Sequence, residues 1–274
     1  MTARAALLLF IPLIGCAPNA PTLPSGAGVP FPGYAAAYGE ATGGCTGVTT
    51  LSAVMSLSGR AGTQRLRGRV DAGLDAPDRI VLEAVAPFGR PFFVLAGSGN
   101  EATLVLPRDR RYLRGEPPAA IVEAITGVAL GPAELRMVLA GCGMPGAEPE
   151  SGRSFDGGWA AVDAGGSTAW LRQIGGRWRV AAAIRGPIAV HYADFGAARP
   201  STVRIRVTSA DPARADLTLR LSDVEVNVPL DPRVFTLDVP ADATPLTLEE
   251  LRRAGPLGET RTPSSRFDPE AKPS

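Results

Sequence analysis

The most regular feature of the chain is an alternation of polar and apolar residues. The stretch 202–208 alternates without a break, and 65–71 does so with Gly68 as its one weak position. Two more stretches, 177–180 and 188–192, follow the same pattern. Because successive side chains of a strand point to opposite faces of a sheet, these segments predict strands with one buried face.

One predicted strand changes phase part-way along. Apolar residues occupy alternate positions in 217–221 and again in 224–228, but the second set is out of step with the first. The change falls at Ser222-Asp223 and predicts a bulge or bend in one long strand. Further strands are predicted at 50–58, 79–85, 91–97, 102–107, 111–114, 159–163, 168–173 and 234–239.

Glycine, aspartate or proline separates most of these strands, as at Gly165-Gly166 and Gly175-Gly176. Many short strands with tight turns favour antiparallel pairing and closure of the sheet on itself. We therefore predict a mainly β (α+β) fold. Its core would be a strongly curved antiparallel sheet of about eleven strands that forms an incomplete barrel.

Helices are predicted to interrupt the strands at 34–44, 117–126, 132–141 and 248–253. The third begins with a proline, which is favoured at the first helical position. It places Leu135, Val138, Leu139 and Cys142 on one apolar face, so that Cys142 should point inward. In the last helix two glutamates precede two arginines, an order that suits the helix dipole.

The first residues carry a secretion pattern. Arg4 is followed by an apolar run over 5–14, which is shorter than the roughly 20 residues that cross a bilayer. The run ends in Leu13-Ile14-Gly15-Cys16, which resembles the bacterial lipobox, although a small residue is more usual than Ile14. The resemblance implies that 1–15 are removed and that Cys16 receives acyl chains such as palmitate. The alternative is an ordinary signal peptide with an incidental cysteine.

Acyl chains on Cys16 would anchor the protein to a membrane. Ala17 stands where many lipoproteins retained in the inner membrane have aspartate, so we expect the periplasmic side of the outer membrane, with the inner membrane as the alternative. Residues 16–32 are rich in proline, glycine and alanine and should act as a flexible tether. Residues 255–274 should be disordered, which leaves 33–254 as a single domain.

The chain has three cysteines. With Cys16 lipidated, Cys45 and Cys142 remain as a pair. Because the periplasm is oxidising, a disulfide between them is plausible, and two separate buried thiols are the alternative. A bridge would link the ends of two helices that cover the sheet.

Composition argues against several classes of function. A formal net charge of +1 is not that of a nucleic-acid binder. The single histidine, His191, lies on a predicted strand and is expected to be a surface or barrel-lining residue. The sequence has no nucleophile elbow, phosphate-binding loop, dinucleotide motif or zinc-ligand spacing. We therefore expect no catalytic residue, no metal and no cofactor.

Two surface features are candidates for contacts. A cluster of arginines, with Asp109 among them, could be a polar turn or could meet lipid headgroups or an acidic partner; it comprises Arg108, Arg110, Arg111 and Arg114. The turn Pro87-Phe88-Gly89 places an aromatic residue at its tip. Phe88 could fold back into the core or could stand exposed and touch a membrane or a lipidated partner.

Several of these residues together resemble the LolA/LolB family of outer-membrane lipoprotein-sorting proteins. The turn Pro87-Phe88-Gly89 is similar to the family's Pro-Leu-Gly turn, and the helix pair beginning at 121–127 is similar to its Leu-Thr-Gly helix pair. Pro132-x-x-Leu135 and Leu139-x-Gly141 continue the match, which spans 48–230. The phenylalanine at the turn, the extra cysteine pair and a longer C-terminal half are departures.

The resemblance implies a half-barrel closed by a helical lid over an apolar cavity. It implies a lipid-anchored, non-enzymatic LolB-type protein, expected to be monomeric, that receives lipoprotein acyl chains. The partner that the resemblance implies is a periplasmic LolA-type carrier. Phe88 would sit where the family has a protruding residue that serves membrane insertion of cargo.

The cavity candidates share apolar character and are also candidates for ordinary core packing; they are Leu66, Ile80, Leu82, Phe93, Leu104, Leu106, Trp170, Trp178, Ile205 and Val207. An envelope lipoprotein that binds another lipid or glycolipid, and a purely structural module with a filled interior, are the alternative functions.

Overall fold

The computed structural model describes residues 22–85, 89–144, 148–208 and 215–254. Cys16, Pro87 and Phe88 lie outside the described residues, as do the expected signal segment and the expected C-terminal tail.

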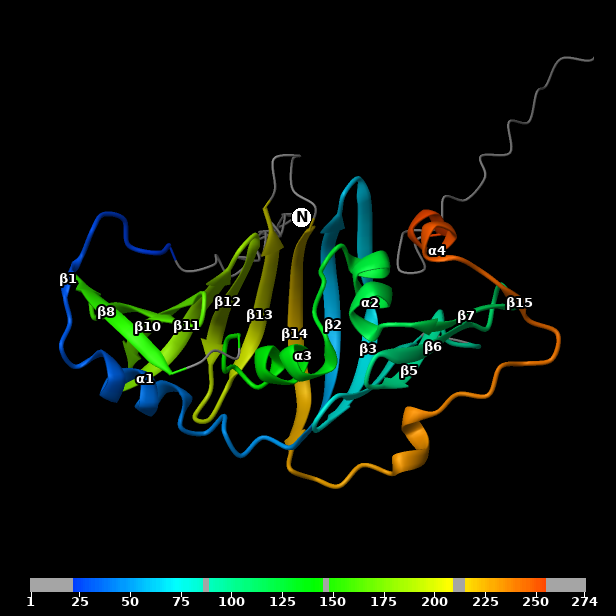
Figure 1. Cartoon of the computed structure of the whole chain (residues 1–274), viewed down its shortest axis with the longest axis horizontal. Coiled ribbons are helices and arrows are strands. Elements are labelled where there is room, and N and C mark those ends of the chain that lie inside the picture. Colours follow the sequence, from blue (N-terminus) through cyan, green and yellow to red (C-terminus); the bar gives the residue numbers. More distant parts are fainter. Residues whose placement is uncertain (1–21, 86–88, 145–147, 209–214, 255–274) are drawn as a thin grey trace, which may run out of the picture.

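The described residues form one large sheet of fifteen strands, shown in Figure 1. Its strands are β1 (Val29–Pro30), β2 (Thr50–Ala61), β3 (Gln64–Asp75), β4 (Arg79–Val85), β5 (Phe93–Ser98), β6 (Glu101–Leu106), β7 (Arg111–Glu116), β8 (Pro149–Phe155), β9 (Trp159–Ala164), β10 (Ser167–Ile174), β11 (Arg177–Arg185), β12 (Ile188–Phe195), β13 (Pro200–Val207), β14 (Ala215–Val226) and β15 (Thr244–Pro245).

The sheet is two antiparallel meanders placed side by side. The strand order is β1-β8-β9-β10-β11-β12-β13-β14-β2-β3-β4-β5-β6-β7-β15. The meanders β8–β14 and β2–β7 follow the chain strand by strand and meet where β14 pairs with β2, and β1 and β15 each add a short strand at one edge. Among the strands of the described residues, β15 alone pairs in parallel, with β7. The ends of the order do not pair with each other, so the curved sheet is an open half-barrel, which confirms the predicted fold class.

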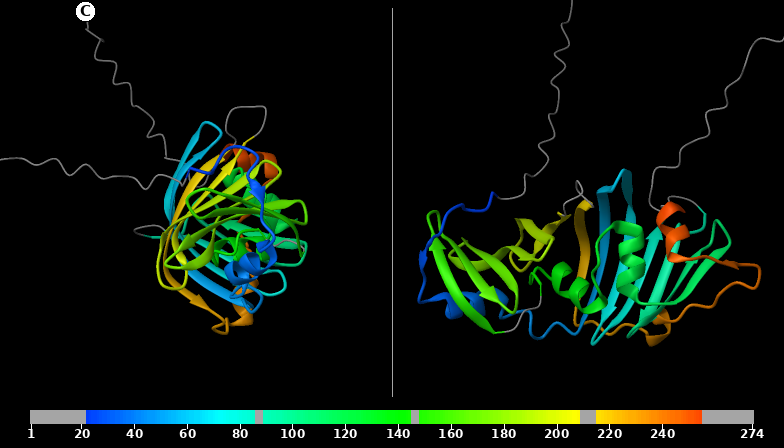
Figure 2. Two further views of the ribbon diagram at one scale, coloured as in Figure 1. Left: turned by 90° about the vertical axis from the view of Figure 1, so that its left-hand side faces the viewer. Right: turned by 45° about the horizontal axis from the view of Figure 1, so that its top comes forward.

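Four α-helices accompany the sheet within the described residues: α1 (Tyr34–Thr42), α2 (Pro118–Thr126), α3 (Pro132–Leu139) and α4 (Leu248–Ala254). The sheet curves around α2 and α3, which lie across its centre (Figures 1 and 2). Helix α1 packs on β8–β11, near the end of the sheet that begins with β1. Helix α4 packs against α2. None of these helices is long and apolar enough to span a membrane.

Alternation along the strands explains which face is buried. In β2, Leu51, Met55 and Leu57 are buried on the concave face, whereas Ser56 and Ser58 are exposed on the other face. The same division holds in β13, where the valines and isoleucine are buried and the arginines point outward. The predicted change of phase is a bulge, because the pairing of β14 with β2 shifts register between Ser222 and Glu225.

The structure corrects the expected strand at 234–239. Residues Pro232–Phe235 form a 3-10 helix, and the chain beyond it is irregular. Asp231 accepts a hydrogen bond from Arg233 N at 3.0 Å and caps this turn, and Pro232 stands at its first position. Phe235 is buried beneath the Arg79 guanidinium, whose central carbon lies 5.1 Å from the ring centroid.

Two ordered segments were not expected. Strand β8 is polar and half-exposed, so it lacks the apolar alternation that marks the other strands. Val29–Pro30, in the segment expected to be a tether, forms β1 and pairs with β8. Phe31 N donates to Gly152 O at 3.0 Å, and the Phe31 ring lies 5.9 Å from that of Trp178. The chain is therefore tied to the sheet edge before α1 begins.

Candidate functional site

An apolar cavity of about 70 Å³ lies between the concave face of the sheet and the helices α2 and α3. Its wall consists of Met55, Leu57, Val70, Leu74, Leu82, Phe93, Val122, Thr126, Val128, Leu130, Leu135, Leu139, Ile205, Leu217 and Leu219. Thr126 is the one polar residue among them. Its hydroxyl donates to Val122 O at 2.7 Å and accepts from Val128 N at 3.2 Å, so its polar atom is satisfied by the helix end.

Inward-facing positions of six central strands form the floor of the cavity, and α2, α3 and their connection form the roof. Gly127 ends α2 in a left-handed conformation, with φ of 75° and its N–H donating to Glu123 O at 2.7 Å. Glu134 in the first turn of α3 accepts from Gly131 N at 2.8 Å and forms an ion pair with Arg185. These contacts turn the chain sharply and place both helices over the concave face, where α2 packs on β2, β5 and β6 and α3 packs on β3 and β4.

The C-terminal end of α3 is the more firmly held part of the roof. The Tyr192 hydroxyl, 1% exposed, donates to Val138 O and accepts from Gly143 N, both at 3.0 Å. Arg199 Nη1 donates to Ala140 O at 2.8 Å. The expected disulfide between Cys45 and Cys142 is present, with a Cα–Cα distance of 5.8 Å, and joins the chain after α1 to the chain after α3.

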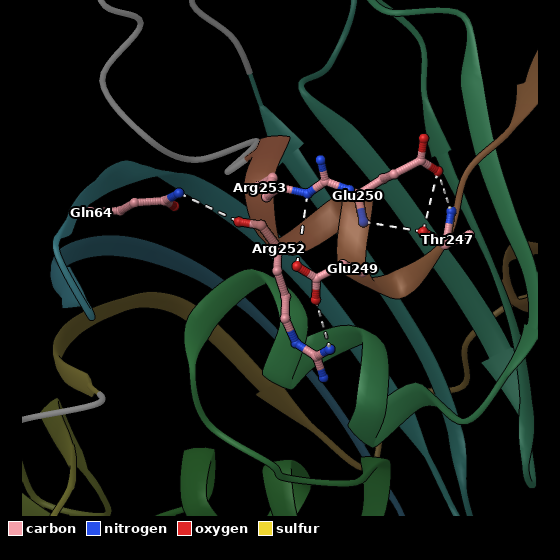
Figure 3. A network of polar contacts seen from close by, with 6 residues as sticks. All are labelled: Gln64, Thr247, Glu249, Glu250, Arg252 and Arg253. Atoms are coloured by element: carbon pink, nitrogen blue, oxygen red, sulfur yellow. Dashed lines mark hydrogen bonds and ion pairs between the residues drawn. The ribbon is translucent and has the colours of Figure 1, made fainter. Parts of the chain in front are cut away.

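Helix α4 supports the other side of the roof. Thr247 and Glu250 form a reciprocal cap: Thr247 N donates to Glu250 Oε2 at 2.8 Å, and Glu250 N donates to Thr247 Oγ1 at 3.2 Å (Figure 3). Leu251 is fully buried, and Arg111 lies 3.1 Å from Glu250. Helix α4 thus packs against α2, and its first turn is held by the ion pair with Arg111 of β7 and by its own cap.

The expected cavity residues fall into three groups. Leu82, Phe93 and Ile205 line the cavity. Others are buried but outside its wall, and these are Leu66, Ile80, Leu104, Leu106 and Val207. Trp178 lines a separate cleft beside α1, and the Trp170 ring packs on Phe155 with centroids 5.3 Å apart.

Sequence reasoning missed most of the wall, above all the residues of the connection between α2 and α3 and the inward positions of β2 and β14. Val128 and Leu130 lie in that connection. Leu217 and Leu219 belong to an alternation that the sequence shows clearly, so a signal for them was available.

The arginine cluster near β7 is engaged with its surroundings. The Arg108 guanidinium carbon lies 4.0 Å from the centroid of the Phe92 ring, and Arg110 lies 3.9 Å from Asp242. Arg111 Nη2 donates to Pro245 O at 2.9 Å. The cluster therefore fastens the segment after β14 to β7. Of the turn expected to carry an apolar tip, the structure describes Gly89, which is exposed with φ of 79°.

His191 lies on the outward face of β12, half-buried beside arginines of β13. Burial lowers the pKa of His191, and the nearby charges of Arg206 and Arg204 lower it further, whereas Asp216 raises it. No group of three His, Cys, Asp or Glu side chains that could hold a metal ion occurs among the described residues.

Comparisons with known proteins give matches among solved structures. No family model matches the sequence, and no curated protein matches it. Similar structures include a LolA superfamily protein from Nitrosomonas europaea, with 12% identity and a TM-score of 0.48 over 73% of this chain and 94% of that one. A putative outer membrane lipoprotein-sorting protein domain from Vibrio parahaemolyticus has 12% identity and a TM-score of 0.42 over 68% and 89%.

The lipoprotein LppX from Mycobacterium tuberculosis is also similar, with 13% identity and a TM-score of 0.32 over 73% of this chain and 98% of that one. The structural neighbours thus include the superfamily that the sequence resembles. At these values the similarity carries no argument about function, which has to come from the cavity itself.

Proposed function

We propose that the protein is a non-enzymatic envelope lipoprotein that binds acyl chains between its sheet and the helices α2 and α3. The observation that carries the proposal is a cavity whose wall is apolar except for one internally satisfied hydroxyl. Such a wall offers burial and no hydrogen bonds, so it suits hydrocarbon better than any polar ligand.

The cavity volume implies that the roof moves when a ligand enters. About 70 Å³ is smaller than the roughly 150 Å³ apolar cavity that takes up a benzene molecule. An acyl chain would therefore have to displace α2 or α3 from the sheet. Burial of each CH₂ contributes about 0.8 kcal/mol, so burial of a long chain outweighs the loss of several lid contacts of about 1 kcal/mol each.

The contacts of the roof indicate which part moves. The end of α3 is fixed by the disulfide, by Tyr192 and by Arg199. The connection from Gly127 to Gly131 carries two wall residues and lies at the opposite end of α3. We therefore assign the opening motion to α2 and this connection, with α3 pivoting about its fixed end.

The proposed lipid anchor would place the cavity next to a membrane. A lipidated Cys16 would hold the domain at the outer membrane, and the apolar turn residue Phe88 would meet that membrane when cargo is transferred. The finer proposal is that the cargo consists of lipoproteins delivered by a periplasmic LolA-type carrier. Another lipid or a glycolipid is the alternative cargo.

The proposal is tested by a substitution that reduces the volume of the cavity and adds no charge to its wall. In a soluble Cys16→Ala form, Val70→Phe places a larger side chain in the cavity wall. The matched control is Val54→Phe on the neighbouring strand, where the side chain faces the other side of the sheet. Binding of a fluorescent fatty acid should weaken at least about tenfold in the first variant and stay unchanged in the second.

Both variants should unfold cooperatively, which circular dichroism checks. No binding by the parent protein would reject the proposed function in favour of a structural module, and binding equal to that of the parent in both variants would reject this cavity as the binding site. Mass spectrometry of molecules that co-purify with the parent form separates the two kinds of cargo. Phe88→Glu should then impair delivery of lipoproteins to vesicles without changing fatty-acid binding.

A further inference from the structure

We propose that a second cleft, between the ends of α1 and α3 and the turn from β12 to β13, binds the phosphate of an anionic lipid whose acyl chains occupy the apolar cavity. This inference rests on the proposed function and specifies the class of lipid. The cleft has a volume of about 580 Å³, within the roughly 300–1,000 Å³ typical of small-molecule sites.

The charge of the cleft wall favours an anion. Three arginines line it, Arg177, Arg179 and Arg199, against one acidic residue, Glu40. Two aromatic side chains, Trp178 and Phe195, lie in the same wall. A guanidinium presents a planar fork of N–H donors that fits phosphate oxygens, and the aromatic rings suit the apolar part of a headgroup.

Two of the guanidinium groups are held in place. Arg179 donates from Nη1 to Ala198 O at 2.8 Å and from Nη2 to Ala197 O at 2.6 Å. Arg199 donates from Nη1 to Ala140 O. Since a guanidinium has five N–H donors, these bonds orient the groups and leave donors for a ligand.

Two observations show that these guanidinium groups are available to an anion. The exposed Arg177 side chain makes no hydrogen bond or ion pair to any other side chain or backbone group in the described part of the chain. Burial lowers the pKa of the Arg199 guanidinium, and its one hydrogen bond goes to a neutral carbonyl. A bound phosphate would supply the negative charge that both groups lack.

The position of the cleft connects it with the apolar cavity. Leu139 lies in the cavity wall, and the next two residues, Ala140 and Gly141, lie in the wall of the cleft. The two spaces therefore lie on either side of the end of α3. Cys45 also lines the cleft, so the disulfide fixes the same end and holds the cleft while the other end of the roof moves. In this proposal the headgroup lies in the cleft, and the acyl chains extend past this end into the apolar cavity.

The experiment separates headgroup from acyl chain. Calorimetry on the Cys16→Ala form compares dioctanoyl phosphatidic acid, dioctanoylglycerol and inorganic phosphate. We expect phosphatidic acid to bind at least about tenfold more tightly than dioctanoylglycerol. Arg177→Gln should remove most of this difference and leave dioctanoylglycerol binding unchanged. Arg67→Gln, an exposed arginine on the outward face of β3, is the matched control and should change neither.

Each other outcome has a distinct meaning. Equal binding of the two lipids, or no effect of Arg177→Gln on their difference, overturns the headgroup site and leaves the acyl-binding function standing. Binding of inorganic phosphate as tight as that of phosphatidic acid overturns the lipid as its source. Failure of both lipids to bind overturns this inference together with the proposed function.

Discussion

At the scale of single residues, Tyr192 is the most consequential polar group under the roof. Its hydroxyl is buried and bonds at once to the carbonyl of Val138 and the N–H of Gly143. Burial raises the pKa of Tyr192, so the group stays neutral and keeps its role as both donor and acceptor at physiological pH. It fixes the end of α3 independently of the disulfide.

Tyr192→Phe should therefore destabilise the protein by about 1–3 kcal/mol, because two buried backbone groups lose their partner. Urea unfolding gives the change in free energy, and hydrogen exchange of the Gly143 amide should become faster. The control is Tyr34→Phe, which removes a single exposed bond of 3.2 Å to Glu150 O. A decrease in the free energy of unfolding as small as that of the control would show that Tyr192 does not hold the end of α3 in place.

The pKa of His191 reports on the electrostatic field at the outward face of the sheet. Its NMR signal is easy to assign because the chain has one histidine. Its pKa is lowered in the folded state, so the unfolded chain binds more protons in the interval below the ordinary value of about 6.5. Its contribution to stability is present above that value and is lost as the pH falls through the folded pKa.

Titration by NMR should place the pKa of His191 below its ordinary value. Arg206→Gln should raise the pKa, because it removes a nearby positive charge, and Asp216→Asn should lower it further. A pKa unmoved by either substitution would contradict the assigned causes.

At the scale of elements, α4 depends on its cap. The helix has seven residues, too few to be stable alone, and its reciprocal bonds between Thr247 and Glu250 satisfy two N–H groups at its start. Ion pairs of Glu249 with Arg252 and Arg253, both at 3.8 Å, are exposed and add little (Figure 3). The cap and the burial of Leu251 therefore hold α4 against α2.

Thr247→Ala should cost about 1 kcal/mol and speed hydrogen exchange in α4 and α2, whereas Thr247→Ser should keep the cap and behave like the parent. If α2 forms the moving part of the roof, the alanine variant should also admit fatty acid faster. Stopped-flow mixing measures that rate. Unchanged exchange in α2 would show that α4 does not support it.

The elements also show how far sequence reasoning could go. Strands such as β2 and β13 were predictable because their alternation encodes a buried and a solvated face. Strand β8, which lies between the two-residue β1 and β9, buries too little apolar surface to show such an alternation. The apolar residues at 234–239 imitate a strand, but Asp231 and Pro232 favour a capped turn.

The cavity was harder to predict than the sheet. Alternation identifies the concave face, and Leu82 and Ile205 are two residues of that face that line the cavity. It does not say which part of that face lies beneath a helix, so Ile80 and Leu104 share the buried character but lie outside the wall. That distinction depends on where α2 and α3 cross the sheet, which no local pattern encodes.

At the scale of the whole molecule, the seam between β14 and β2 joins the two meanders and also forms part of the cavity floor. Leu57 on one side and Leu217 and Leu219 on the other line the cavity. Gly59 lies at this seam opposite Leu217, with φ of 148°. A Cβ at Gly59 would lie 2.1 Å from Asp216 O, so only glycine permits the observed approach of the strands.

Gly59→Ala should destabilise the protein by at least about 1–3 kcal/mol, because the backbone must separate at the seam to relieve this contact. Gly39→Ala is the matched control: it lies in α1 with nothing within 4 Å of the added Cβ, and alanine there should stabilise the helix by roughly 0.5–1 kcal/mol.

The three tryptophans lie in β9, β10 and β11, so their fluorescence reports on one meander, whereas circular dichroism reports on both. In the control the two signals should change together during urea unfolding. In Gly59→Ala they should separate, because the seam is what couples the two meanders; coincident transitions in both variants would show that the disulfide and the helices couple them instead.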